Sequence, residues 1–572
     1  MKELTSTVRI SGRPITDYVI VTASSPTSTE TYSAENLKKY LDLALDADFA
    51  VINDTQPKGE YEILVGVTNR RPRNPELQSE EIEICATTGQ LSICGGDDRG
   101  TFYAVLAFLE SYIGWRWFGA DTEVLRPQAA REIFAGEVVR RKPFFEYRNA
   151  MFFDATRNSE FKTKISMNTS ISEDIKAKTG GSVDYSGFVH TFTYLLPEKE
   201  YFETHPEYYA LRDGVRKPTQ PCLSNPDVLE IVTKNALETL RKNKQAFISI
   251  SQNDNQAYCQ CEKCRAIDEE EGSPSGILLR FVNKVAEAIE KEFPDVLVDT
   301  LAYQYTRALP KITRPRHNVM IRLCSIECCF RHPLYDEQCE ANQRFCKDIN
   351  DWSSICDRIY VWDYCTNFCH YSMAQPNYNI LRENIKYYAQ HNVVGMLSQG
   401  NYNGKGADLN EFKSYILSKL YWNPFMSDAE YEYHITDFLE GFYGKGWRYI
   451  RKYMDILLEE TADKHFGCFC SAVGNYERVY DRMDEILELF DKAYELAEGI
   501  QKDHVKLARL SAINIKLQIL NTKEFAEGSP EKADRIAQKV AYYDECKSFG
   551  LRPMEWRPFS DDNEENLVNG CL

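Results

Sequence analysis

The stretch Phe247-Ile248-Ser249-Ile250-Ser251, followed directly by Gln252-Asn253-Asp254-Asn255, decides how the middle of the chain folds. Its β-branched run predicts a buried strand, and the polar residues after it predict a loop at the carboxyl end of that strand. Seven further short apolar runs share the pattern, at 146–153, 187–192, 220–223, 296–303, 319–325, 359–363 and 394–399. Amphipathic helical stretches such as 277–289 separate them. Eight such runs over about 280 residues predict a (β/α)8 TIM barrel rather than an open sheet.

The two flanks of this barrel have different patterns. Residues 1–142 alternate short strands and helices and predict a small N-terminal α/β domain that ends at the linker Arg140-Arg141-Lys142-Pro143. After Asn423-Pro424 the strand pattern stops, and apolar stripes at helical spacing predict an all-α domain over 425–572. The catalytic barrel is therefore expected to occupy residues 143–424.

The composition excludes several classes of function. The chain has 572 residues and a net charge of −18, and no basic run stands out, which argues against nucleic acid as a partner. No apolar stretch reaches the roughly 18 residues that a membrane-spanning helix needs. The start, Met1-Lys2-Glu3-Leu4-Thr5-Ser6, lacks the apolar core of a secretory signal, which indicates either an intracellular protein or a mature form whose leader was removed.

Polar and aromatic side chains follow the predicted strands, at the end of a barrel where catalytic groups gather. Three of them are carboxylates, and we expect these to be catalytic: Asp254, Glu327 and Asp363. Aromatic rings that stack on a sugar and polar groups that bind hydroxyls are the expected substrate-binding residues, and they comprise His190, Asn253, Tyr303, Tyr305, Trp362, Gln399, Asn401, Tyr402 and Arg148. This set of residue types predicts a carbohydrate pocket.

Cleavage of a glycosidic bond needs a protonated acid on the leaving oxygen and a second group that activates water, attacks the sugar or braces a substrate acetamide. Asp254 is the expected acid, and Glu327 or Asp363 is the expected base or nucleophile. The alternatives are structural: Asp254 as an Asx-turn or helix-capping residue, and the other two as salt-bridge partners of an arginine. A uronic acid substrate would need a cation in the pocket, for which Arg148 and Arg322 are candidates.

Cysteines are unusually frequent in this chain. There are eighteen, of which twelve fall between Cys222 and Cys369. Cys259, Cys261 and Cys264 form a compact cluster that could bind a structural metal with a fourth ligand from Cys222, Cys328 or Cys329. Disulfides or free buried thiols are the favoured interpretation, because paired C-x-x-C knuckles are absent. We therefore expect no cofactor and no catalytic metal.

Several longer motifs resemble those of the bacterial domain-of-unknown-function family 4838. They are Ile250-Ser251-Gln252-Asn253-Asp254-Asn255, Cys259-Gln260-Cys261-Glu262-Lys263-Cys264, Gly272-Ser273-Pro274-Ser275-Gly276, Asp299-Thr300-Leu301-Ala302-Tyr303-Gln304-Tyr305-Thr306, Cys324-Ser325-Ile326-Glu327-Cys328-Cys329, Trp362-Asp363-Tyr364 and Gln399-Gly400-Asn401-Tyr402. The stretches Gly96-Asp97-Asp98-Arg99-Gly100-Thr101-Phe102-Tyr103-Ala104-Val105 and Gly114-Trp115-Arg116-Trp117-Phe118 resemble the non-catalytic α/β domain of β-hexosaminidases and α-glucuronidases. The order of the three domains is also similar to α-glucuronidases and α-N-acetylglucosaminidases.

The resemblance implies a glycosidase that acts at the chain ends of a complex glycan, with uronic acid or N-acetylhexosamine end groups, in the periplasm or at the cell surface of polysaccharide-degrading bacteria. One departure limits the transfer of roles: the Asp-Glu pair that follows strand four in β-hexosaminidases is Asn253-Asp254 here. An α-glucuronidase-like arrangement fits better through Asp254, Glu327 and Asp363. The alternatives are a barrel that binds glycans without cleaving them and a zinc-dependent hydrolase built on the cysteine cluster; a cytoplasmic location also stays open.

Overall fold

A curled parallel sheet of six strands forms the centre of the molecule, as seen in the computed structural model, which describes residues 8–126, 131–469 and 472–556. The strands run side by side in the order β12-β19-β18-β17-β16-β15. Their bounds are Tyr147–Met151 (β12), Phe247–Ser249 (β15), Leu297–Ala302 (β16), Val319–Cys324 (β17), Ile359–Tyr364 (β18) and Val393–Gln399 (β19). The sheet is a half-barrel of the TIM type, so that part of the sequence-based prediction is confirmed.

The opening between β12 and β15 is bridged by irregular chain. Asn168 donates its backbone N–H to Arg148 O of β12, and Val183 N–H donates to Asn168 O at 2.7 Å. Ser186 N–H then donates to Phe247 O of β15 at 2.7 Å. The circle of backbone hydrogen bonds thus continues through residues 168–187 without regular strands.

Two of the eight predicted strands are not part of this sheet. Of the run 187–192, only Gly187 accepts a hydrogen bond from β15; His190 has a positive φ of 52°, and helix α6 (Phe192–Leu195) begins at the end of the run. The run 220–223 ends a local antiparallel hairpin, β13 (Tyr209–Arg212) with β14 (Val215–Pro221). Local pairing with a neighbouring segment takes the place of long-range parallel pairing here.

Helices cover the outside of the sheet. They are α8 (Pro226–Lys242), α10 (Ser275–Glu292), α11 (Glu340–Ser353), α12 (Leu381–Ala389) and α13 (Asn410–Trp422), while α9 (Glu262–Glu271) packs on α10. In α8 the Asn225 side chain accepts from Asp227 N–H, and Pro226 takes the first helical position, where no N–H is needed. The apolar face of α10, with Phe281, Val282 and Val285, is buried.

The N-terminal region is built on a six-stranded mixed sheet of order β11-β6-β7-β5-β3-β4. Its strands are β3 (Val19–Thr22), β4 (Val51–Asn53), β5 (Glu62–Val65), β6 (Ile82–Thr87), β7 (Gln90–Gly95) and β11 (Val138–Arg141), with helices α1 (Ser28–Leu45) and α2 (Asp98–Phe108). The hairpin of β8 (Trp115–Gly119) and β9 (Thr122–Leu125) reaches the helices that follow the barrel, where Arg116 pairs with Asp437 at 2.5 Å. A small sheet joins β10 (Arg131–Ile133), β1 (Val8–Ile10) and β2 (Arg13–Pro14).

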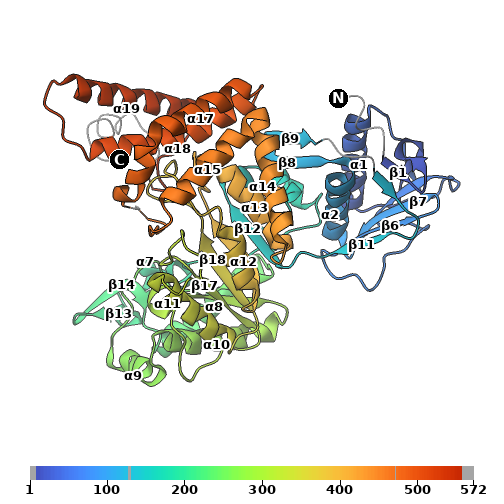
Figure 1. The fold of residues 1–572 in the computed structure, drawn as a ribbon. Helices are drawn as coiled ribbons and strands as arrows, with labels where there is room; N and C mark the ends of the chain where they lie inside the picture. Colours follow the sequence, from blue (N-terminus) through green and yellow to red (C-terminus); the bar gives the residue numbers. More distant parts are fainter. Residues whose placement is uncertain (1–7, 127–130, 470–471, 557–572) are drawn as a thin grey trace.

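Helices make up the C-terminal part of the described chain. They are α14 (Asp428–Tyr443), α15 (Trp447–Glu460), α16 (Glu477–Asp481), α17 (Met483–Leu496), α18 (Gln501–Asn521) and α19 (Pro530–Ser548). Figure 1 shows α13 and α14, in orange, between the blue N-terminal region and the other C-terminal helices. After α19 the chain turns back to the barrel, where Arg552 N–H donates to Lys405 O and Tyr371 N–H donates to Pro553 O.

One continuous apolar core joins the three regions, from Val8 through the barrel strands to Ile515 in α18. The proposed boundaries at 142 and 424 therefore stay predictions. Among the described residues, none of the helices is both long and apolar enough to cross a membrane.

Candidate active site

Side chains alternate between the two faces of each barrel strand, and this alternation decides which predicted residues reach the interior. Tyr147, Phe247, Met320, Tyr360 and Leu397 form one apolar cluster inside the sheet. Two residues further along their strands, toward the carboxyl ends, lie Arg322, Trp362 and Gln399. The next inward positions of β16 and β17 bring Tyr303 and Cys324 together with Trp362 and Leu301.

Asp254 lies in the loop that follows β15, and its side chain is exposed at the carboxyl end of the barrel. The loop is fixed by its neighbour Asn253, whose N–H donates to Gln220 Oε1 at 3.0 Å and whose Nδ2 donates to Thr219 O at 2.9 Å. Tyr303 donates its hydroxyl to Asp254 Oδ1 at 3.1 Å. Burial, and then the negative charge of Asp254, raises the pKa of Tyr303 well above its ordinary value, so the phenol stays protonated and keeps donating.

Glu555 is a carboxylate of this site that sequence reasoning missed. It belongs to the segment that returns from α19, and its N–H donates to Phe368 O at 2.9 Å. Gln399 Nε2 donates to Glu555 Oε1 at 3.0 Å, and Trp362 Nε1 donates to Gln399 Oε1 at 2.9 Å. Burial raises the pKa of Glu555, although the hydrogen bond from Gln399 and the charge of Arg552 oppose this rise. Contacts connect its carboxylate to Asp254: Gln399 bonds Trp362, Trp362 packs with Tyr303, and Tyr303 donates to Asp254. No strand-end pattern marks this residue, since its segment lies about 150 residues beyond the last barrel strand.

Several predicted substrate-binding residues surround this pair. Tyr402 precedes Asn403, whose Nδ2 donates to Glu555 O at 2.9 Å, and burial and then the charge of Glu555 raise the pKa of the Tyr402 phenol. The half-buried His190 ring lies 6.4 Å from the Tyr303 ring, and its Nδ1 is 2.7 Å from Gln252 O. The structure therefore brings together Asp254, Glu555, His190, Asn253, Tyr303, Trp362, Gln399 and Tyr402 at the carboxyl end of the sheet.

Asp363 does not belong to this group, contrary to the sequence-based prediction. Because Tyr360 and Trp362 point into the barrel, the intervening odd positions of β18 face the helices outside. Asp363 is buried there and accepts hydrogen bonds from Ser325 Oγ at 2.6 Å and from Tyr388 of α12 at 3.2 Å. Burial raises its pKa to about 6.

Glu327 is exposed at the rim and forms an ion pair with Arg307 at 2.6 Å, which also pairs with Asp348. The contacts of Glu327 in this structure are therefore those of a salt-bridge partner, which was the structural alternative to a catalytic role. Because the Glu327 carboxylate is exposed, a bound substrate could displace Arg307 from it. Glu327 therefore stays a candidate for contact with a substrate at the edge of the barrel.

Three other predicted binding residues are placed away from the substrate side. Arg148 is fully buried and pairs with Glu80 at 2.7 Å, so it is an interior residue. Asn401 is buried and donates to Gly404 O at 2.8 Å. Tyr305 stacks on Tyr258 with the ring centres 4.6 Å apart, behind the Asp254 loop.

Arg322 is the other cation that was considered for binding a uronate. Its guanidinium lies 4.7 Å from the ring centres of both Tyr185 and Phe188, and its Nε donates to Asp299 at 3.1 Å. The side chain is almost fully buried, and the Trp362 ring packs 5.7 Å from it on the side toward the site. This cation is therefore enclosed and does not face a substrate.

A second pair of carboxyl groups lies at the end of β12, at the interface with the β8–β9 hairpin. Asp154 accepts from Ala120 N–H at 3.0 Å, and burial together with the charge of Asp154 raises the pKa of Glu411 to about 8. The adjoining cavity measures about 10 Å³, which is too small for a sugar and is the size of one water molecule. A larger cavity of about 340 Å³ between α12, α14 and α15 is lined by Arg382 and Arg451, and both already have acidic partners.

The protein is thus a half-barrel of the TIM type with polar and aromatic side chains gathered at the carboxyl end of its strands. A family model described as "Domain of unknown function (DUF4838)" matches residues 118–455, more than half of the chain. The protein belongs to this family, which confirms the resemblance given by its motifs.

One solved structure shares this fold with a TM-score above 0.5, and two others match with lower scores. A structure described as "A novel family GH115 4-O-Methyl-alpha-glucuronidase, BtGH115A, with specificity for decorated arabinogalactans" matches with a TM-score of 0.60 at 12% identity, over 96% of this chain and 79% of that one. A GH138 enzyme targeting pectin rhamnogalacturonan II matches with a TM-score of 0.48 at 10% identity, over 94% of this chain and 93% of that one. A chitobiase of Flavobacterium johnsoniae matches at 0.44 and 11% identity, over 96% of each chain. No curated protein matches by sequence.

Proposed function

We propose that this protein is a glycoside hydrolase that releases terminal sugars from a complex glycan. The observation that carries the proposal is that Asp254 and Glu555, from two distant segments, are linked at the carboxyl end of the barrel through Tyr303, Trp362 and Gln399. Aromatic rings and amides beside two carboxyl groups are what sugar cleavage requires. The likeness in fold to an α-glucuronidase supports the reaction class and not a particular sugar.

The environments of the two carboxyl groups suggest how the roles divide. Glu555 is half-buried with a raised pKa, which favours its protonated form, so we assign it as the proton donor to the leaving oxygen. Asp254 is exposed to solvent and accepts a hydrogen bond from the Tyr303 hydroxyl. We assign Asp254 as the partner carboxylate, which activates water or attacks the sugar. The sequence alone predicted Asp254 as the proton donor, so this assignment gives Asp254 the opposite role.

The remaining side chains would position the sugar and the carboxyl groups. Gln399 holds Glu555 and is itself held by Trp362, so this indole has both an orienting and a stacking role. Trp556, which is 58% exposed, stacks on Phe469 at 5.9 Å next to Glu555 and offers a ring for a second sugar unit. Uronic acid and N-acetylhexosamine end groups both remain candidates for the terminal sugar.

A substrate screen tests this proposal. Purified protein would be incubated with a panel of aryl glycosides and with plant and host glycans, and released sugars would be separated and quantified. We expect release of one class of terminal sugar. If no sugar is released while a glycan binds in a calorimetric titration, the hydrolase proposal is wrong and the protein is a glycan-binding barrel.

A further inference from the structure

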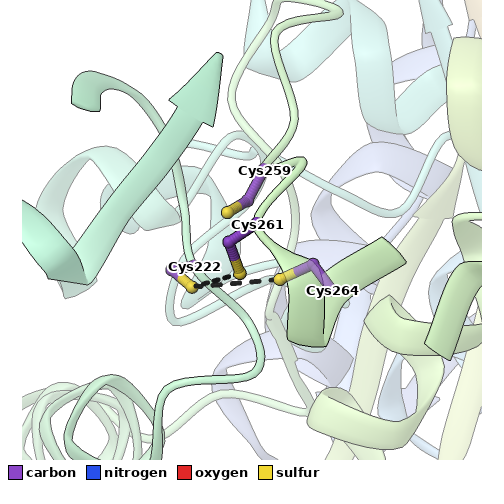
Figure 2. Close-up of side chains that lie close together, drawn as sticks. All are labelled: Cys222, Cys259, Cys261 and Cys264. Carbon is purple, nitrogen blue, oxygen red and sulfur yellow. Dashed lines mark hydrogen bonds between the residues drawn. The ribbon is translucent and has the colours of Figure 1, made fainter. Parts of the chain in front are cut away.

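Four cysteine sulfurs from two segments of the chain, Cys222 and residues 259–264, lie close together (Figure 2). Cys222 directly follows β14, Cys259 and Cys261 lie in the loop after β15, and Cys264 lies in the first turn of α9. All four Sγ atoms lie within 4.8 Å of one another, and all four thiols are free. Three of them are buried and Cys261 is half-buried.

The spacing of these sulfurs matches a tetrahedral metal site. Cys222 Sγ lies 3.7 Å from Cys261 Sγ and 3.8 Å from Cys264 Sγ. Four Zn–S bonds of about 2.3 Å at tetrahedral angles place neighbouring sulfurs about 3.8 Å apart. A disulfide would require about 2.05 Å between the bonded sulfurs. The four side chains are therefore arranged around a common centre and not as two bonded pairs.

Hydrogen-bond donors surround the cluster, as they do around zinc thiolates. Leu211 N–H donates to Cys259 Sγ at 3.4 Å, and the Arg216 guanidinium donates to the same sulfur at 3.8 Å. Ser224 Oγ lies 3.2 Å from Cys264 Sγ and 3.7 Å from Cys261 Sγ. Four thiolates around Zn²⁺ carry a net charge of −2, which these donors partly offset.

We propose that Cys222, Cys259, Cys261 and Cys264 bind one structural Zn²⁺. Each thiol releases its proton to solvent on binding. Four protein ligands leave no open position for water, so the ion would stabilise structure and not activate a nucleophile. It would fix the loop that carries Asp254 to the end of β14, beside the hydrogen bonds that Gln220 makes to Asn253 O and Asn255 O.

An independent cluster of two cysteines and two histidines lies between the barrel and the C-terminal helices. Cys329, His332 and Cys339 lie in the chain between β17 and α11, and His465 lies in the chain that follows α15. Their ligand atoms are within 4.8 Å of one another. Cys329 Sγ lies 3.5 Å from His332 Nδ1, and Cys339 Sγ lies 3.7 Å from His465 Nδ1.

These distances also fit zinc. Bonds of about 2.3 Å to sulfur and about 2.05 Å to nitrogen place S and N about 3.5 Å apart in a tetrahedron. The other nitrogen of His332, Nε2, is 3.0 Å from Ala462 O. A carbonyl that accepts the second ring N–H is the usual partner of a zinc-bound histidine, because it leaves Nδ1 free to bind the metal. We infer that Cys329, His332, Cys339 and His465 bind a second Zn²⁺ that joins the strand-β17 loop to the chain after α15.

Metal content tests both sites in the full chain. Protein would be produced with added zinc, purified without chelators, and analysed for zinc by mass spectrometry and for protein by amino-acid analysis. We expect two Zn²⁺ per chain, one in Cys261→Ser, one in His465→Ala, and none in the double variant. Cys85→Ser, a buried thiol outside both clusters, and His317→Ala, an exposed histidine, are the matched controls and should keep both ions.

Replacement of zinc by Co²⁺ identifies each donor set even if a variant fails to fold. In the native protein, tetrahedral Co²⁺ should give intense visible absorption with sulfur-to-metal charge transfer, stronger at the four-cysteine site than at the site with two histidines. A protein with no zinc above the level of the buffer, or with disulfides between these cysteines in its intact mass, overturns the proposal. Zinc that stays at two per chain in Cys261→Ser or His465→Ala overturns it for that site.

Discussion

Asp254→Asn is expected to lower the rate of sugar release at least a hundredfold while the melting temperature stays within about two degrees of the wild type. Among the residues that the structure describes, Tyr303 donates the one hydrogen bond to this exposed carboxylate, and an amide oxygen can still accept it, so folding should be little affected. The amide cannot attack the sugar or take a proton from water, and loss of such a group typically costs about 10²–10⁴ in rate. Steady-state kinetics on the sugar identified by the screen, with thermal unfolding measured in parallel, provide the comparison.

The matched control is Asp363→Asn, because it makes the same chemical change on the other face of the sheet. Asp363 accepts from Ser325 and Tyr388 and does not reach the site, so the turnover number of folded protein should change less than about threefold. Glu555→Gln should lose activity as Asp254→Asn does, and the raised pKa of Glu555 means that activity falls on the alkaline side as this acid deprotonates. Equal losses in Asp254→Asn and Asp363→Asn would contradict the assignment and restore the one based on sequence alone.

Sequence patterns located the barrel because its strands are short apolar runs with polar residues at their ends. Both faces of each barrel strand are buried, and a short apolar run in the sequence indicates such burial. This holds for β12, β15, β16, β17, β18 and β19. The run at 220–223 has the same composition, but Pro218 and Pro221 belong to a local hairpin, and composition does not distinguish local from long-range pairing. The place of the two missing barrel strands is bridged by residues 168–187, which form no regular strand.

The site was predictable only where strand geometry controls it. Asp254, Tyr303, Trp362 and Gln399 follow from the rule that catalytic groups lie at strand ends. Asp363 also lies at a strand end, but its side chain points to the outer face of the sheet, because successive residues of a strand point to opposite faces. Glu555 could not be predicted, because only the folding of the chain after α19 back onto the barrel brings it to the site. The hydrogen bond from Glu555 N–H to Phe368 O holds it there.

The two cysteine-containing clusters also differ in how far the sequence could predict them. Cys259, Cys261 and Cys264 are close in sequence, so their proximity was evident, and Cys222 joins them because the β13–β14 hairpin packs on the loop. His465 lies 126 residues after Cys339, and only the packing of the chain after α15 against the strand-β17 loop brings their ligand atoms together. Clusters within one loop are therefore visible in the sequence, whereas clusters between regions are not.

Arg148→Met is expected to destabilise the protein by about 3–5 kcal/mol, because it breaks a buried ion pair that joins the barrel to the N-terminal region. Arg148 Nη1 and Nη2 donate to the two Glu80 oxygens at 2.7 and 3.0 Å, and Nε donates to Ser166 O at 2.8 Å. Both partners are buried, and without Arg148 the Glu80 carboxylate keeps Arg99 and Asn168 but loses its bidentate partner. Chemical unfolding at pH 7 measures the loss, and Arg241→Met, at an exposed pair with Glu292, is the matched control that should show no measurable change.

The pH dependence of stability separates the ion pair from simple loss of packing. Arg148 lowers the pKa of Glu80 to about 2 although burial opposes this, whereas the unfolded value is near 4.5. A lowered folded-state pKa contributes stability that is fully present above about pH 4.5 and is lost as the pH falls toward 2. The difference in stability between wild type and Arg148→Met should therefore shrink over this interval, and Arg148→Met combined with Glu80→Gln should cost less than the sum of the two single changes. A difference that is constant with pH, together with additive single changes, would mean that Arg148 acts through packing alone.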